Sequence, residues 1–202
     1  MTITHIFFDI GGVLGSNGWD ADMRASAAAQ FGLDPGDFAE RHEEAVGSFE
    51  QGRMSLDEYL DATVFYKPRP FSRDAFRAFM LAQSVPDPEA IAFAHTLARS
   101  GRYRLMTLNN ESQELNVHRV REFGLAEIFV TFFSSCWVGV LKPSRRIYEL
   151  ALAMSQAEPE RSVLIDDRER NLEPARALGM HGILFSDARQ LATDLAALGV
   201  RP

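Results

Sequence analysis

The chain of 202 residues contains a single cysteine, Cys136, so no intrachain disulfide can form. A reducing compartment fits that composition, and a small buried thiol is the ordinary role of a lone cysteine. The chain also lacks a basic N-terminal segment followed by a long apolar run, so we expect no signal peptide. Its most apolar helix-like stretch, residues 90–98, is short and carries His95. We therefore expect a cytoplasmic protein with no membrane partner.

Positive charge is also scarce, with 21 basic against 28 acidic residues and a net charge of −7. Such a chain repels nucleic acid and anionic membranes, so neither is expected as a partner. A site for an anionic substrate must then supply its own local positive charge. The two basic clusters, Arg145-Arg146 and residues 118–121, which include Arg119, are interpreted as solvated helix faces. The five histidines lack the spacing of a metal site, and no internal repeat is present.

Short apolar runs with β propensity alternate with helical segments along most of the chain. The helical pattern is clear at 87–100 and at 143–154, where Pro143 is expected in the first turn. This alternation predicts an α/β fold, a Rossmann-like parallel sheet covered by helices. The expected strands are residues 5–8, 103–108, 128–133, 162–165 and 181–185.

One long region contains no predicted strand and interrupts this alternation. Residues 17–86 contain four expected helices instead, at 19–31, 35–50, 55–66 and 72–83. They predict an inserted four-helix cap domain, with residues 1–16 and 87–202 forming the α/β core. Because ligands bind at the carboxyl ends of parallel strands, an insert leaving from that edge would cover the site as a lid.

Polar side chains follow three of the predicted strands at the point where each strand ends. Each alone has an ordinary explanation as a turn or helix-capping residue. Together they place carboxylates, amides and one ammonium at a single edge of the sheet, which indicates a catalytic or binding site. The residues are Asp9, Asn109, Asn110, Asp166 and Asp167, with Lys142 before the helix that leads into the third strand.

The order of these residues resembles that of the haloacid dehalogenase-like hydrolases, which are mostly phosphatases. The resemblance lies in the segments FFDIGGVL (7–14), LMTLNNES (105–112), VLKPSRRIY (140–148) and VLIDDRERNLEPARALGM (163–180), with FEQGRMSLDEY (49–59) in the cap. The chain looks closest to the branch with a small helical cap, which includes the phosphatase domain of soluble epoxide hydrolases and certain sugar-phosphate phosphatases.

This resemblance implies that Asp9 is the nucleophile and forms an aspartyl-phosphate. It also implies Mg²⁺, held by Asp9, the backbone carbonyl of Gly11 and Asp167, with Asp166 as a supporting partner. Lys142 would add positive charge beside the nucleophile.

The phosphate contacts implied by the resemblance come from two loops. They are the backbone N–H groups at Ile10 and Gly11, the side chains of Asn109 and Asn110, and Lys142.

Two positions depart from the family pattern. Gly11 stands where phosphatases of the family carry the aspartate that protonates the leaving oxygen, and general acid–base help of this kind is typically worth ~10²–10⁴-fold. Glu50 or Arg53 in the cap, or a bound water, could substitute for it. Asn109 replaces a serine or threonine, and its bulkier amide could still donate to a phosphate oxygen.

Three functions stay open at this point. The first is a magnesium-dependent hydrolase of a small phosphorylated metabolite, slowed by the missing acid at Gly11. The second is a 2-haloacid dehalogenase, against which the paired acids Asp166 and Asp167 argue. The third is a non-catalytic domain that binds a metal or phosphate, which the changes at Gly11 and Asn109 favour. The sequence predicts neither the substrate nor the oligomeric state.

Overall fold

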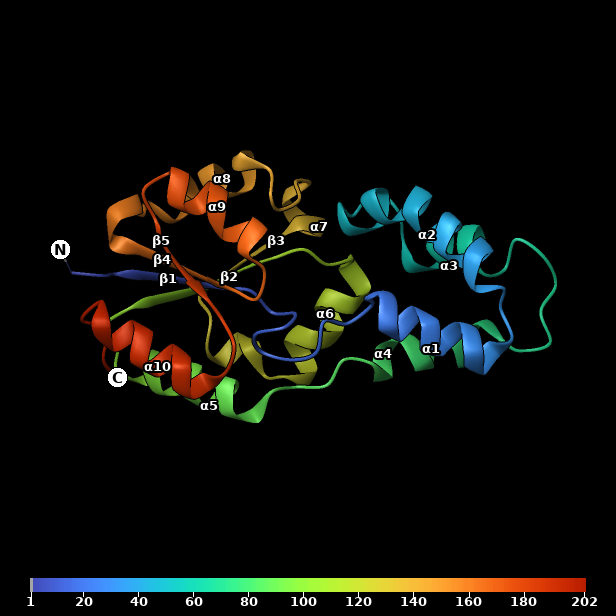
Figure 1. The fold of residues 1–202 in the computed structure, drawn as a ribbon, viewed down its shortest axis with the longest axis horizontal. Helices are drawn as coiled ribbons and strands as arrows, with labels where there is room; N and C mark the ends of the chain where they lie inside the picture. Colours follow the sequence, from blue (N-terminus) through green and yellow to red (C-terminus); the bar gives the residue numbers. More distant parts are fainter. Residues whose placement is uncertain (1) are drawn as a thin grey trace.

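A computed structural model describes residues 2–202, in which five parallel strands form the centre of the molecule (Figure 1). Their order in the sheet is β3-β2-β1-β4-β5, so the N-terminal strand is in the middle. The predicted α/β fold with a parallel sheet is confirmed, and all five strands end at the same edge. The strands are β1 (His5–Phe8), β2 (Arg104–Asn109), β3 (Thr131–Ser134), β4 (Ser162–Asp166) and β5 (His181–Leu184).

Helices cover both faces of the sheet (Figure 1). Helices α5 (Pro88–Arg99) and α10 (Ala188–Ala197) lie on one face, and α8 (Arg145–Ser155) and α9 (Glu169–Ala177) lie on the other. Successive strand side chains point to opposite faces, so β1 divides between the two apolar clusters. Ile6 and Phe8 pack in the first cluster, and Phe7 packs in the second.

Four helices lie beyond the carboxyl edge of the sheet (Figure 1). They are α1 (Ala21–Phe31), α2 (Pro35–Glu50), α3 (Leu56–Thr63) and α4 (Arg73–Ala82). An aromatic-rich cluster that includes Trp19, Phe38, Tyr59 and Phe76 holds them together. Gly32 ends α1 with a left-handed conformation, and Ser55 with Glu58 forms a capping box before α3. The domain boundary at residues 17–86 stays a prediction.

The chain enters and leaves these helices along two segments that lie side by side. Ser16 N donates to Val85 O at 2.8 Å, and Val85 N donates to Ser16 Oγ at 3.0 Å. Helix α6 (Gln113–Glu122) also joins the two parts, since its Leu115 packs in the cluster of the four helices. Phe123, which follows α6, packs against the sheet.

The remaining elements are short, and the predicted start of the third strand is wrong. The segments are a 3₁₀ turn, Leu125–Glu127, α7 (Ser135–Val138) and a second 3₁₀ turn, Pro159–Arg161. The strand was expected to begin at residue 128. The backbone N–H groups of Ile128 and Phe129 instead donate to Leu125 O and end the first 3₁₀ turn, so β3 begins at Thr131. None of the helices within residues 2–202 has the length and hydropathy to cross a membrane.

The expected helix at 143–154 begins later than predicted. Lys142 is held through both its backbone N–H and its carbonyl by the side chain of Asn110. Lys142 and Pro143 form a turn that Ser144 N closes by donating to Leu141 O at 2.9 Å. Ser144 then precedes the first residue of α8, Arg145, so Pro143 lies outside the helix.

Candidate active site

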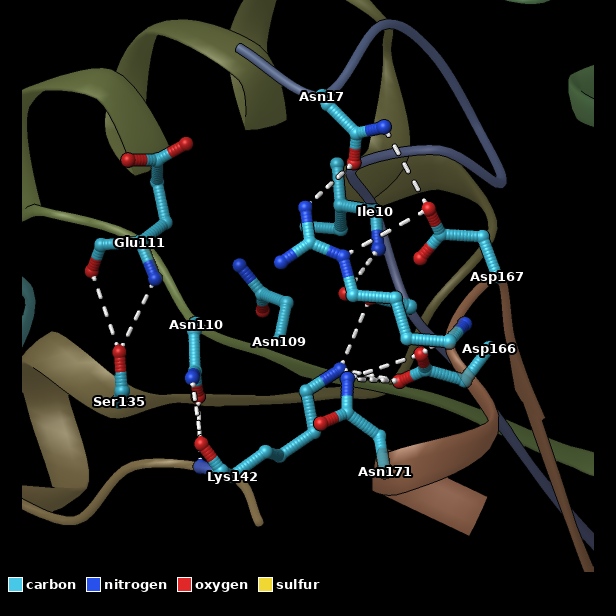
Figure 2. A network of polar contacts seen from close by, with 12 residues as sticks. Ile10, Asn17, Asn109, Asn110, Glu111, Ser135, Lys142, Asp166, Asp167 and Asn171 are labelled. Carbon is cyan, nitrogen blue, oxygen red and sulfur yellow. Dashed lines mark hydrogen bonds and ion pairs between the residues drawn. The ribbon is translucent and has the colours of Figure 1, made fainter. Parts of the chain in front are cut away.

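A buried lysine lies between two buried carboxylates at the carboxyl edge of the sheet (Figure 2). Lys142 Nζ is 2.9 Å from Asp9 Oδ2 and 2.6 Å from Asp166 Oδ2. The Asp166 side chain is fully buried, and the other two residues are less than a tenth exposed. Buried charges must be paired, so these contacts fix the three side chains relative to one another.

Each member of this group is positioned by a different element. Asp9 directly follows β1, and its backbone N–H donates to Ile165 O of β4 at 2.9 Å. Asp166 ends β4, and its Oδ1 accepts from Arg168 N and Asn171 Nδ2, both at 2.9 Å. Lys142 comes from the loop before α8, which Asn110 at the end of β2 holds through hydrogen bonds of 2.8 and 2.9 Å.

A third carboxylate, that of Asp167, completes an acidic cluster. Asp9, Asp166 and Asp167 each offer a carboxylate oxygen, and these oxygens lie within 4.8 Å of one another. Asp167 Oδ1 is buried and has no hydrogen-bond partner among residues 2–202. An unused carboxylate oxygen beside others is the donor set that Mg²⁺ prefers, so these residues fit that ion.

The charge balance of the cluster also favours a cation. Burial raises the pKa of Asp9 to about 7; Lys142 opposes this rise, and the carboxylates of Asp166 and Asp167 add to it. Lys142 and Arg168, whose Nε is 3.8 Å from Asp167 Oδ2, leave one negative charge of the three acids unbalanced, and a bound cation would offset it.

The loop after β1 approaches the acidic cluster closely. Gly12 has a positive φ of 73°, and a Cβ at this position would overlap the carboxylate of Asp167. Ile10 N donates to Asp9 Oδ1 at 2.8 Å. The second glycine of the pair is thus required by both backbone conformation and close approach.

The two asparagines at the end of β2 lie differently. Asn110 lines the cavity above Asp9, whereas Asn109 does not and is 2% exposed. Asn109 Nδ2 donates to Asn116 Oδ1 at 3.0 Å, and its own Oδ1 accepts from Ser134 Oγ at 2.8 Å. These bonds join β2, β3 and α6, and the expected contact of Asn109 with phosphate stays a prediction.

A cavity of about 560 Å³ opens above Asp9, between the sheet edge and the inserted helices. Its walls are strongly polar and carry both signs of charge. Glu50 of α2 lines it, and burial raises the pKa of this carboxyl to about 7, with Glu111 adding to the rise. Cationic side chains also line it: Arg24, Arg119, Lys142, Arg168 and Arg170.

Arg119 is one of the residues lining the cavity that the sequence interpretation missed. The prediction that it lies on a solvated helix face is wrong, since it is 2% exposed and lines the cavity. It follows Leu115 by four residues and therefore shares the inward face of α6. That spacing was the available signal, but the basic neighbours His118 and Arg121 favoured the interpretation as a solvated face.

Residues 3–179 match the family described as haloacid dehalogenase-like hydrolases. The chain is a haloacid dehalogenase-like hydrolase. This match covers most of the chain and includes every strand except β5.

Curated relatives of this hydrolase include bifunctional epoxide hydrolase 2 of Rattus norvegicus, 32% identical over 132 residues. That match covers 63% of the chain and 24% of the relative. Flavin mononucleotide hydrolase 1 of Arabidopsis thaliana is 38% identical over 68 residues, which cover 34% of the chain and 28% of the relative. The hydrolase thus spans about a quarter of the length of these relatives.

Among solved structures, an enzyme of the same family from Bacteroides thetaiotaomicron, in complex with magnesium and inorganic phosphate, has a TM-score of 0.76. It is 18% identical, and the superposition covers 94% of this hydrolase and 98% of that chain. At this identity the likeness supports the shared fold.

Proposed function

We propose that this chain is a magnesium-dependent hydrolase of small phosphomonoesters that acts through an aspartyl-phosphate on Asp9. The proposal depends on one observation, the position of Lys142 Nζ at 2.9 Å from Asp9 and 2.6 Å from Asp166 in the floor of the cavity. A carboxylate beside a buried ammonium is suited to attack an anionic centre, because the cation offsets the repulsion.

In the proposed reaction, a carboxylate oxygen of Asp9 forms a bond to phosphorus, and the bond to the ester oxygen breaks. The phosphoryl oxygens would be held by Lys142, by backbone N–H groups at Ile10 and Gly11, and by the amide of Asn110. The proposed contact from Asn109 requires its amide to turn away from Asn116 and Ser134 towards the cavity. Water then attacks phosphorus, the carboxylate of Asp9 is restored, and the protons of that water leave with the phosphate.

Asp9, the Gly11 carbonyl and Asp167 are the proposed Mg²⁺ ligands, and Asp166 supports Lys142. The bound ion would supply positive charge that reduces repulsion between the nucleophile and the phosphate. The magnesium and phosphate complex of the Bacteroides enzyme and the flavin mononucleotide hydrolase relative support this proposal.

The proposed substrate is a small phosphorylated metabolite that enters the cavity of about 560 Å³. The polar walls suit an ester whose alcohol part carries hydrogen-bonding groups. A cytoplasmic location belongs to the same proposal, because a chain with one cysteine fits a reducing compartment.

The test is a set of initial rates on p-nitrophenyl phosphate and phosphorylated sugars, with Mg²⁺ and with EDTA. We expect hydrolysis that needs Mg²⁺ and that falls to background in Asp9→Asn. Asp61→Asn is the matched control, since Asp61 lies exposed on α3 and should leave the rate unchanged. An Asp9→Asn variant as active as the unmodified chain would overturn the proposal.

Each of the two alternatives has a test of its own. Chloride release from 2-chloropropionate that EDTA does not affect would identify a dehalogenase. Binding of Mg²⁺ or phosphate in calorimetry, with no turnover of any substrate, would identify a non-catalytic domain.

A further inference from the structure

The guanidinium of Arg119 borders the space that the missing side chain of Gly11 leaves open. A Cβ at residue 11 would lie 3.5 Å from Arg119 Nη1 and 3.6 Å from Asn17 Oδ1. An arginine on α6 therefore borders the position at which an acid on residue 11 would act on the leaving oxygen.

Arg119 is buried, yet its hydrogen-bond donors are only partly used. Its Nε donates to Ser84 Oγ at 3.2 Å, and its Nη2 has no partner among residues 2–202. Its Nη1 is 3.7 Å from Glu111 Oε2, which is too long for a hydrogen bond. Nη2 lies against Gly18, whereas Nη1 makes no hydrogen bond among residues 2–202 and borders the space at Gly11. Nη1 is therefore the group of this buried cation that is able to donate to an oxygen of a ligand.

Glu111 is the acidic neighbour of this cation. Its Oε1 accepts from Ser112 N at 2.9 Å. Its own backbone N–H donates to Ser135 Oγ at 3.0 Å (Figure 2). Glu111 lines the same cavity as Arg119 and Asp9. The carboxylate is thus tied to the backbone and lies within ion-pair range of the guanidinium, at 3.7 Å.

On the basis of the proposed phosphohydrolase function, we propose that Arg119 is a catalytic residue that donates an N–H to the leaving oxygen as the P–O bond breaks. Asp9 forms the new bond to phosphorus, and the electron pair of the broken bond stays on the leaving oxygen. A guanidinium does not give up its proton at ordinary pH, so the leaving group departs as an anion and takes a proton from solvent afterwards.

This chemistry selects a class of substrate. Leaving groups that are stable as anions need only the charge and hydrogen bond of Arg119. Acyl, enol and aryl phosphates are therefore the preferred substrates, and phosphates of simple alcohols are poor ones. Loss of a preorganised donor to a developing oxyanion typically costs ~10²–10³-fold in rate.

Arg119 also has structural contacts, and these define the competing explanation. Its Nε bonds to Ser84 in the segment that leaves the inserted helices, and a Cβ at Gly18 would overlap its guanidinium. A residue that only holds these segments together would affect all substrates equally. A residue that stabilises the leaving oxygen affects poor leaving groups most.

The experiment compares kcat/KM across aryl phosphates of graded leaving-group pKa, with acetyl phosphate and one alkyl phosphate at the extremes. The test variant is Arg119→Met with Glu111→Gln, because removing the cation alone would leave a buried carboxylate unpaired. We expect a loss of ~10²-fold or more on the poorest leaving groups, less than ~10-fold on acetyl phosphate, and hence a steeper dependence on leaving-group pKa.

Three further variants complete the test. Arg119→Lys keeps the positive charge and should show nearly the same dependence of kcat/KM on leaving-group pKa as the unmodified chain. Arg121→Gln is the control, since the side chain of Arg121 on the same helix is 84% exposed. Gly11→Asp should give no gain on alkyl phosphates, because its carboxylate would pair with Arg119. If the double variant does not fold, the same comparison of kcat/KM across leaving groups is made with Arg119→Lys and Gly11→Asp.

The outcomes separate this inference from the function on which it rests. An equal loss on all substrates in the double variant, or a large gain in Gly11→Asp, overturns the role of Arg119 and leaves the phosphohydrolase proposal intact. Absence of Mg²⁺-dependent hydrolysis by the unmodified chain on every substrate overturns both.

Discussion

At residue 12 the loop after β1 touches the carboxylate of Asp167, and no side chain fits between them. Gly12→Ala would combine an unfavourable positive φ with an overlap against Asp167. We expect a loss of ~1–3 kcal/mol in the free energy of unfolding and a weaker affinity for Mg²⁺. Chemical denaturation and calorimetry measure the two effects.

Gly47→Ala is the matched control for this substitution. Gly47 lies inside α2, and no atom beyond the backbone of its own helix comes within 4 Å of the place that a Cβ would take. We expect this substitution to stabilise the protein by ~0.5–1 kcal/mol, because alanine is the better helix former. Equal effects of the two substitutions would contradict the close approach at Gly12.

The residues of the candidate site differ in how well their positions could be predicted from the sequence. Asp9 and Asp166 end apolar strands, and the rule that parallel strands share one carboxyl edge brings them together. The strand ends also place Asn110 and Lys142 at this edge, but their mutual hydrogen bonds depend on the course of the loop before α8 and were not predicted. Arg119 was not predicted, because its burial depends on how α6 packs between the sheet and the inserted helices.

At the scale of one helix, the capping box before α3 is a local source of stability. Ser55 Oγ accepts from Glu58 N, and the Glu58 carboxylate accepts from Ser55 N at 2.8 Å. Ser55→Ala should cost ~1 kcal/mol of unfolding free energy, measured by denaturant titration. Ser26→Ala in the exposed middle of α1 is the control and should be close to neutral, so equal losses would contradict a specific capping effect.

The buried His42 of α2, which contacts Tyr59 of α3, makes the free energy of unfolding depend on pH. Trp19 Nε1 donates to Tyr59 Oη at 2.8 Å, which leaves the tyrosine hydrogen for His42 Nδ1 at 2.9 Å. Burial lowers the pKa of His42 to about 4, and the nearby Arg24 contributes to this fall. The unfolded chain therefore binds a proton at higher pH than the folded protein, so stability falls as pH drops from about 6.5 towards 4.

His42→Asn removes this titration. Between pH 7.5 and 4.5, we expect the free energy of unfolding to fall by up to ~2 kcal/mol more in the unmodified protein than in the variant, after allowance for solvent screening. Urea denaturation at both pH values measures this double difference. An equal pH dependence in the two proteins would contradict a neutral, buried His42.

The elements themselves follow largely from local pattern. The apolar runs that became β1, β2, β4 and β5 are short and separated by helices, which favours parallel pairing. The start of β3 was wrong because an apolar run does not distinguish a strand from a buried turn, and Leu125 accepts the hydrogen bonds of Ile128 and Phe129. Pro143 lies outside α8 because Asn110, distant in sequence, holds the preceding residue.

For the molecule as a whole, the acidic cluster predicts that Mg²⁺ raises stability. A ligand at 100 times its dissociation constant adds ~2.7 kcal/mol to the folded state, which for a chain of this size raises Tm by roughly 5–10 °C. Thermal unfolding with Mg²⁺ and with EDTA measures the shift. Asp167→Asn should largely abolish it, and a shift that survives this change would place the ion elsewhere.

The paired segments at Ser16 and Val85 bring the beginning and the end of the inserted helices within one hydrogen bond of each other. A segment whose ends meet in this way can be replaced by a longer or shorter one without separating the strands that carry the acids. The inserted helices can therefore be replaced by others during evolution, while the loops that hold the three acids at the sheet edge keep their positions.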